Sequence, residues 1–199
     1  MTSNVVLKSS TISAGSTVKL DNPNVNSGVT ILTGMSAADM PIQLTSGRAA
    51  TGAVITATAG SGIMGISRTA GTSLALVGEA TSGNAKTNAA IFFTALPFSY
   101  NDGTALSIVA NAEVTGSGTL TAASTTIEVA VNSIVAGAET ALSVTGGAQK
   151  FTATPTDYTW AVAGTNLTAG MQLAVTTTTI VTSSSGANTG KLNSLVLKA

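Results

Sequence analysis

Residues 88–114, which read NAAIFFTALPFSYNDGTALSIVANAEV, predict two β-strands joined by a sharp corner. Residues 88–96 are almost continuously apolar, as expected for a central strand of a sandwich. Residues 104–114 alternate instead, which places one set of apolar side chains on a single face: Leu106, Ile108, Ala110 and Ala112. The Asn-Asp-Gly turn at 101–103 joins the two strands. This stretch therefore predicts two successive strands of an all-β core.

The same pattern of short strands and turns continues along the chain in both directions. We expect further strands at residues 53–59, 63–68, 73–79, 125–133, 150–154, 158–163, 171–182 and 192–197. In residues 125–133 the core-facing side chains are Ile127, Val129 and Val131. Glycine-containing turns separate the segments, and no repeat of 20–50 residues appears. About eight to ten short strands predict an all-β fold, a β-sandwich of the jelly-roll type.

The first 50 residues differ from the rest of the chain. They contain Pro23, Pro41 and an Asn-rich stretch at 22–26, with only short apolar pieces between them. We therefore expect an extended N-terminal arm with short strands over residues 1–50. A single jelly-roll domain over residues 51–199 follows it. The alternative is that residues 1–50 already supply a first pair of strands to the sandwich.

The composition excludes several classes of function. The 199 residues include eight Lys and Arg, eight Asp and Glu, and no Cys or His, so thiol and imidazole chemistry is excluded. A net charge of zero argues against a nucleic-acid partner, which requires clustered Lys and Arg. The chain is dominated by 34 Thr, 32 Ala, 22 Ser and 21 Gly. Because so few charges oppose self-association, we expect much of the surface to be covered in an assembly. The alternative is a free monomer whose surface hydroxyls keep it in solution.

The sequence also lacks the signals of export and of membrane insertion. No apolar run approaches the 18 residues of a membrane helix, and the N-terminus has no basic region followed by an apolar one. We therefore expect a protein made in the cytoplasm, without a membrane partner.

Two glycine-rich stretches match nucleotide-binding motifs only in part. Residues 60–65, GSGIMG, fit G-x-G-x-x-G, but the pattern after them is not that of the helix that would hold a pyrophosphate. Residues 186–191, GANTGK, have three residues between the glycines where a phosphate loop has four, and Leu192 replaces the required hydroxyl. We interpret both stretches as turns.

The remaining reactive side chains do not suggest catalysis. The chain has eight carboxylates for acid–base chemistry but only seven aromatic residues to line a sugar-cleaving cleft. We therefore expect no enzymatic activity, no metal site and no cofactor. Arg48 and Arg68 are candidates for a subunit contact, with solvation or local capping as the alternative. Alternation assigns Phe151, Tyr158 and Trp160 to the core, although an interface anchor is the other interpretation.

The corner between the two opening strands carries a resemblance to a known family. Leu96, Pro97, Tyr100 and Gly103 form the pattern Leu-Pro-x-x-Tyr-x-x-Gly. Here Pro97 ends a strand, Tyr100 packs over the corner and Gly103 permits the reversal. With its flanking strands, from residue 76 to residue 131, this block resembles the central block of jelly-roll capsid cement (decoration) proteins of tailed bacteriophages. It departs from that pattern by a second aromatic residue, Phe98, after the proline.

The resemblance implies a structural virion protein that binds the outer capsid surface as a homotrimer, contacts the major capsid protein and stabilises the shell. Such a protein is made in the host cytoplasm. The arm is expected to reach the shell or sister subunits, which adds Pro23 and Pro41 to the candidate interface residues. One alternative is a phage fibre or receptor-binding β module that recognises host-surface glycans. A second alternative is a jelly-roll carbohydrate-active enzyme.

Overall fold

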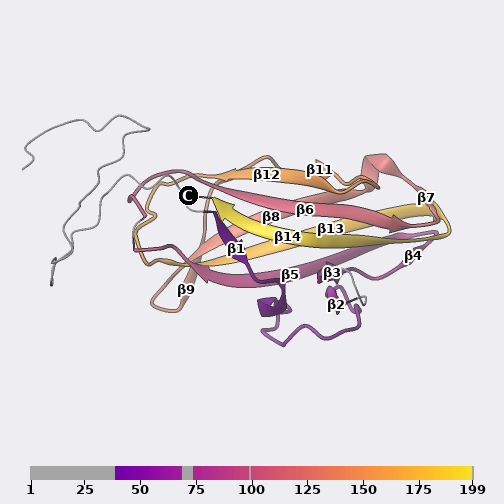
Figure 1. Cartoon of the computed structure of the whole chain (residues 1–199), viewed down its shortest axis with the longest axis horizontal. Helices are drawn as coiled ribbons and strands as arrows, with labels where there is room; N and C mark the ends of the chain where they lie inside the picture. The colour runs from indigo at the N-terminus through magenta and orange to yellow at the C-terminus, as the bar shows by residue number, and fades with distance from the viewer. Residues whose placement is uncertain (1–38, 69–73, 99, 199) are drawn as a thin grey trace, which may run out of the picture. The chain divides into compact units, whose positions relative to one another are not determined.

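The computed structural model describes residues 39–68, 74–98 and 100–198. This part of the chain is a sandwich of two antiparallel sheets, which confirms the predicted all-β class (Figure 1). One sheet has eight strands and the other has six. Two 3-10 turns, η1 (Leu44–Ser46) and η2 (Ala122–Ser124), are the helical segments of the described ranges.

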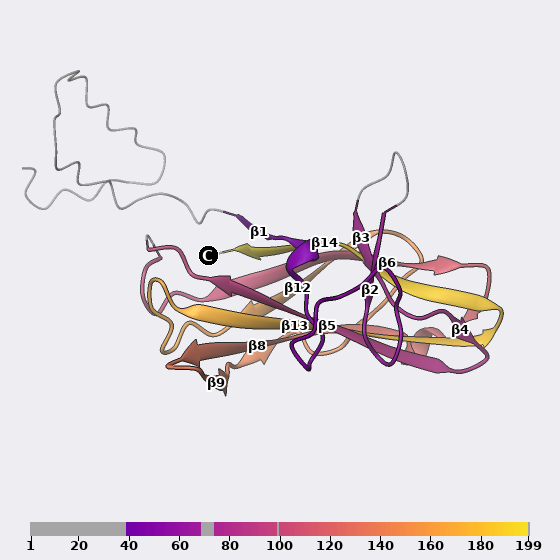
Figure 2. The same cartoon turned by 90° about the horizontal axis from the view of Figure 1, so that it is seen from below.

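The two sheets form separate layers, with β1 and β14 in one and β8 and β9 in the other (Figure 2). The eight-stranded sheet has the order β10 (Val144–Thr145), β12 (Thr156–Val162), β6 (Leu106–Gly116), β14 (Ala187–Lys198), β3 (Ala75–Val77) and β2 (Gly65–Ser67), and β1 (Met40–Ile42) and β4 (Thr81–Ser82) also pair with β14. The six-stranded sheet has the order β11 (Gln149–Lys150), β8 (Thr126–Val135), β13 (Gln172–Ser185) and β5 (Ala85–Ala95), with β7 (Thr119–Leu120) on β13 and β9 (Ala138–Ala141) on β8.

The principal strands pair in a nested order. The first of them, β3, pairs with the last, β14, while β5 pairs with β13, β6 with β12 and β8 with β9. The strands named in these four pairs follow one another in the chain. Apart from β8 and β9, which form a hairpin within one sheet, each of them lies in the sheet opposite to that of the strand before it. A long hairpin that is rolled into two sheets in this way has the topology of a jelly roll.

Alternate residues of the long strands fill the space between the sheets. On β6 and β8, all seven side chains that the alternation assigns to the core are buried: Leu106, Ile108, Ala110, Ala112, Ile127, Val129 and Val131. These predictions are confirmed. A period of two is sufficient here because each strand has one face toward the opposite sheet and one face outward.

The three clustered aromatic residues also belong to the core, as the alternation predicts. Phe151, Tyr158 and Trp160 are buried, and the Phe151 and Tyr158 rings meet edge to face with centroids 6.0 Å apart. The Trp160 indole N–H donates to the carbonyl oxygen of Gly147 at 2.7 Å, which satisfies its polar atom inside the core.

Three predicted strands differ from the structure. Of residues 150–154, only Lys150 lies in a strand, β11, and residues 151–154 form none. Residues 53–59 alternate but form only an isolated bridge between Val54 and Arg48, so the prediction of a strand there is wrong. Residues 88–96 do lie largely in β5, but β5 is the outer strand of its sheet and not a central one. The segment around Arg48 covers its free edge, because Arg48 and Ile91 exchange two backbone hydrogen bonds of 2.7 and 2.8 Å. A covered edge is protected from pairing with other chains.

The described part of the expected arm belongs to the sandwich. In the β1–β14 pair Met40 lies opposite Leu197, and Ile42 and Leu44 are buried in the core. Residues 40–44 therefore pack with the sandwich although they precede residue 50, and a strand of three residues is too short to show alternation. Residues 1–38 of the expected arm, which include Pro23, lie outside the described residues.

Candidate interaction surface

The corner that carries the resemblance lies at one end of the sandwich, where β5 stops at Ala95. Leu96 is buried, and its N–H donates to the carbonyl oxygen of Met171 at 2.9 Å. Tyr100 is also buried, and its hydroxyl donates to the carbonyl oxygen of Thr104. Burial, followed by the charge of Asp102, raises the pKa of the Tyr100 phenol above its ordinary value. The hydroxyl therefore acts as a hydrogen-bond donor that closes the corner.

The second half of the corner is tied to the segment before β13. Gly103 has a φ of +80°, a conformation that glycine adopts without strain. Its N–H donates to the carbonyl oxygen of Leu167 at 3.0 Å, and the Asp102 carboxylate accepts the N–H of Ala169 at 2.7 Å. Two segments more than 60 residues apart in the sequence are thus joined at this end of the sandwich.

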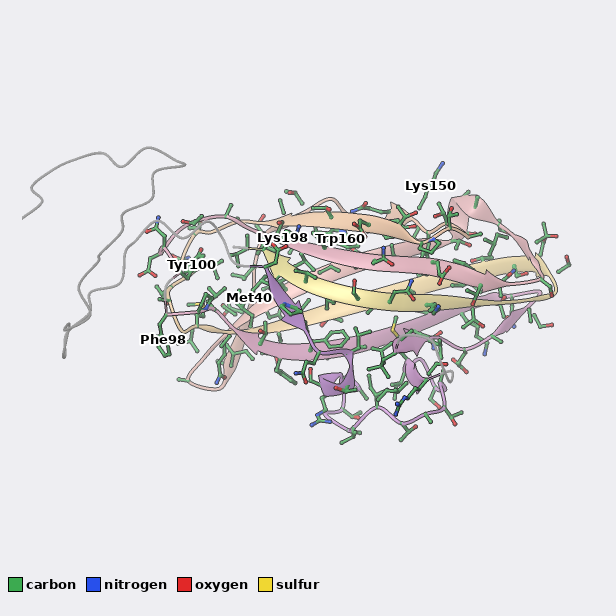
Figure 3. The ribbon with its side chains drawn as sticks, viewed as in Figure 1. Met40, Phe98, Tyr100, Lys150, Trp160 and Lys198 are labelled. Atoms are coloured by element: carbon green, nitrogen blue, oxygen red, sulfur yellow. The ribbon has the colours of Figure 1, made fainter. Side chains whose placement is uncertain are left out.

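Phe98 lies exposed on this corner, between the buried residues Leu96 and Tyr100. The Phe98 side chain is 92% exposed, at the same end of the molecule as Tyr100 (Figure 3). Its ring lies against Gly170, where an added Cβ would be 2.9 Å from the Phe98 Cε1 atom. Gly170 also has a φ of +75°, so glycine is favoured there for two reasons. A large apolar ring is thus held out toward solvent.

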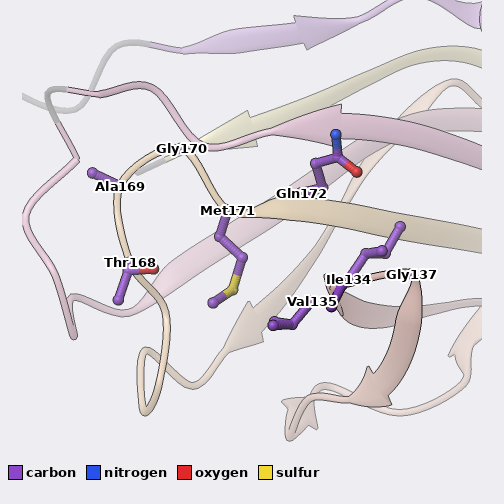
Figure 4. Close-up of a pocket in the computed structure, with 9 residues that line it drawn as sticks. Ile134, Val135, Gly137, Thr168, Ala169, Gly170, Met171 and Gln172 are labelled. Atoms are coloured by element: carbon purple, nitrogen blue, oxygen red, sulfur yellow. The ribbon is translucent and has the colours of Figure 1, made fainter.

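Three adjoining hollows continue from this point across the end of the six-stranded sheet. The first, of about 560 Å³, lies between the turn of the β8–β9 hairpin and the start of β13 and is lined by residues 134–137 and 168–172 (Figure 4). The second shares Ile134 and Gln172 with the first and extends to residues 93–95. The third shares Phe93 and Thr94 with the second and reaches residues 41–43 and Ser46.

We call the residues that line these three hollows, together with Phe98, the uncharged strip. None of them is charged. Phe93 is 50% exposed and Val135 is 59% exposed, so the strip holds three of the four large hydrophobic residues that are exposed in the described part of the chain. Glu139 lies at its rim, opposite Ile134 in the β8–β9 pair, and accepts a hydrogen bond of 2.8 Å from Asn132.

The outer face of the eight-stranded sheet has the opposite character. Lys191 on β14 forms an ion pair of 2.9 Å with Glu113 on β6, and Asn111 donates to Asp157 at 2.7 Å. Asn193 stands at a register shift of β14 and donates to Asn111 at 3.1 Å, which links these groups into one network. This face is therefore suited to water, whereas the uncharged strip is suited to contact with protein.

The other candidate interface residues are not brought together with the corner by any contact of the described chain. Arg48 lies on the segment that covers the edge of β5, and Arg68 is exposed after β2. In the described ranges neither arginine forms an ion pair. Pro41 is exposed on β1 and lines the third hollow, so it belongs to the uncharged strip.

The first nucleotide-like motif is a turn, as the sequence analysis predicts, whereas the second is a turn only at Gly186, because its residues 187–191 lie in β14. Gly60 and Ile63 exchange backbone hydrogen bonds of 3.1 and 3.0 Å around Ser61 and Gly62, which both have positive φ. These are the backbone angles of a type I′ turn. Gly186, with a φ of +68°, turns the chain directly from β13 into β14.

Glu79 fastens the first of these turns to the sandwich. Its carboxylate accepts the N–H of Gly62 at 3.4 Å and the side-chain amide of Asn88 at 3.3 Å, and it lies 3.6 Å from the ammonium of Lys86. The Gly62 N–H, then Asn88 and Lys86, lower the pKa of Glu79 against an opposing effect of burial. The ionised carboxylate of Glu79 is therefore the form that connects this turn to Asn88 and Lys86.

Sequence reasoning found the corner but missed most of the uncharged strip. Phe93, Val135 and Met171 come from three distant parts of the chain, and no local motif connects them. The one available signal was the pair Phe92-Phe93, because adjacent residues of a strand face opposite ways and one ring must point outward.

No group of three or more carboxylates in the described ranges is placed to hold a metal ion. Within residues 39–68, 74–98 and 100–198, no helix has the length and apolarity of a membrane span. In comparisons with known proteins, no family model and no curated protein matches the chain.

Proposed function

We propose that this protein is a structural component of a virus particle, a capsid cement protein of the tailed-bacteriophage type. In this proposal it binds the outer surface of the assembled shell as a homotrimer, contacts the major capsid protein and stabilises the shell. It is made in the host cytoplasm, takes no cofactor and performs no catalytic step.

The observation that carries the proposal is the uncharged strip on a jelly-roll sandwich. Adjoining hollows and exposed aromatic rings without charge are suited to a surface that another protein covers. The resemblance of the corner at residues 96–103 to tailed-phage cement proteins supplies the class of assembly. The corner also has a direct part in the strip, since it positions Phe98 over Gly170.

The physical effect of such a protein is stabilisation by mass action. A partner that binds the assembled shell but not its free subunits adds its binding free energy to the assembled state. Because the strip has no charge, contacts made through it should depend little on ionic strength, unlike contacts made through ion pairs. Particle binding that persists at about 1 M salt is therefore expected if the strip contributes to it.

The test combines the mass of the free protein with its binding to particles. Light scattering after size-exclusion chromatography should give about 58 kDa, three copies of the 19.4 kDa chain. The protein should sediment with expanded shells of the virus whose genome encodes it, and not with isolated shell subunits. A 19.4 kDa monomer that binds host glycans and leaves shells unbound would contradict the proposal and favour the receptor-binding alternative.

A further inference from the structure

We propose that Phe98 and the first hollow of the uncharged strip form a contact between copies of this chain, in which Phe98 of one copy enters the first hollow of the next copy. The hollow presents Ile134, Val135 and Met171 to the ring. This inference rests on the homotrimer of the proposed function and names the residues that join its copies.

The first argument is the position of the exposed ring. Phe98 stands between Leu96 and Tyr100, which are both buried and both hydrogen-bonded through their backbone N–H groups. Its ring lies against Gly170, where an added Cβ atom would be 2.9 Å from the Phe98 Cε1 atom. The buried residues on either side fix where the corner presents the ring, and exposed aromatic side chains of this kind dominate interface energies.

The second argument is the form of the hollow. It is a shallow, open hollow of about 560 Å³, in which Ile134, Val135 and Met171 offer apolar side chains for an aromatic ring to contact. Figure 4 shows the Met171 side chain extending from the start of β13 toward the side of Val135. A thioether side chain adapts its shape and makes favourable contacts with aromatic rings. The hollow is open to solvent, so a ring from outside has access to it.

The third argument identifies the occupant. A charged partner surface would lose its hydration against the strip and find no opposite charge there, because no lining residue is charged. A second copy offers a neutral ring and meets no like-charge repulsion. Phe98 and the hollow also lie side by side on one end of the molecule, since Gly170 contacts the ring and lines the hollow. A rotation axis near this end brings the ring of each copy to the hollow of the next, and a closed ring of copies results.

The test uses charge at the two halves of the contact. Phe98→Lys changes the ring and Val135→Glu changes the hollow, and both positions are exposed, so the sandwich should remain folded. Val54→Lys is the matched control, because Val54 is 63% exposed but lies outside the strip. Sedimentation velocity over about 1–100 μM measures association, and circular dichroism checks the fold. Each strip substitution should weaken association at least about tenfold.

The double variant Phe98→Lys with Val135→Glu should recover association to within about threefold of wild type, because opposite charges then face each other across the contact. The proposal alone is overturned if Phe98→Lys and Val135→Glu leave association unchanged, if Val54→Lys weakens association equally, or if the double variant shows no recovery. A wild-type protein that stays monomeric at about 100 μM overturns both this contact and the proposed homotrimer. Loss of shell binding with self-association intact would sink the proposed function alone. Wild-type monomers whose shell binding is lost with Phe98→Lys would instead assign the strip to the shell.

Discussion

The adjacent rings of Phe92 and Phe93 on β5 provide the sharpest test of the fold. Phe92 is 0% exposed, in the core, whereas Phe93 is 50% exposed in the uncharged strip. Replacing each by alanine removes the same atoms from neighbouring positions of one strand. Any difference in stability between the two variants therefore reports which face of β5 is turned toward the opposite sheet.

The expected magnitudes follow from burial. Removing a fully buried Phe side chain loses about 1.5–3 kcal/mol of transfer free energy. The cavity that remains raises the cost of Phe92→Ala to about 3–5 kcal/mol. Phe93 is about half exposed, so Phe93→Ala loses only about half of this transfer free energy and leaves no closed cavity. It should therefore cost about 1 kcal/mol. If Phe92→Ala fails to fold, Phe92→Leu should cost about 1.5 kcal/mol and preserve the comparison.

Equilibrium unfolding in urea measures these free energies. Trp160 is the single tryptophan of the chain and is fully buried, so its fluorescence reports exposure of the core. All variants are compared at a protein concentration where they share one oligomeric state, because Phe93 lies in the uncharged strip. Equal losses for Phe92→Ala and Phe93→Ala, or a larger loss for Phe93→Ala, would refute the assigned faces of β5.

Three further predictions test the corner, the core and the first glycine turn. Tyr100→Phe removes the hydroxyl that donates to the Thr104 carbonyl and should cost about 1 kcal/mol, which calorimetry should detect as a Tm lower by about 2–4 °C. Gly190→Ala places a Cβ 2.9 Å from the Phe151 ring and 3.1 Å from Val181, and should cost about 1–3 kcal/mol in urea unfolding. Glu79 has a lowered pKa in the folded protein, so its stabilising effect is present above the ordinary value of 4.5 and is lost as the pH falls through the folded value. Hydrogen exchange should therefore show the turn at residues 60–62 losing protection in acid, and Glu79→Gln should remove that pH dependence.

Each of these has a matched control or a contradicting result. An unchanged Tm for Tyr100→Phe would mean that the hydroxyl does not close the corner. Gly60→Ala meets no atom within 4 Å and should change stability by less than about 0.5 kcal/mol, so an equal effect at Gly60 and Gly190 would refute the close approach of Phe151. Acid-induced loss of protection that persists in Glu79→Gln would assign the effect to another group.

Much of the fold could be predicted because local patterns carry it. The alternation of β6 and β8 placed seven side chains in the core, and the structure has all of them there. Alternation failed at residues 53–59, where the chain has a partner only at the isolated bridge of Val54 to Arg48. A strand needs a neighbour along its length, and a local pattern does not reveal whether one exists. Alternation failed in the opposite sense at β1, which it did not predict. This strand pairs with β14, but its three residues are too few to show a period.

By itself, the sequence determined the all-β class, the inward faces of β6 and β8, the turns and the corner at residues 96–103. These depend on residue type and on spacing along the chain, through the two-residue period of a strand and the backbone freedom of glycine. Only the tertiary structure decided that β5 is an outer strand and that Phe93, Ile134 and Met171 share one surface. The nested pairing of distant strands brings those residues together, and the free energy of that pairing is distributed over contacts between segments that are remote in the sequence.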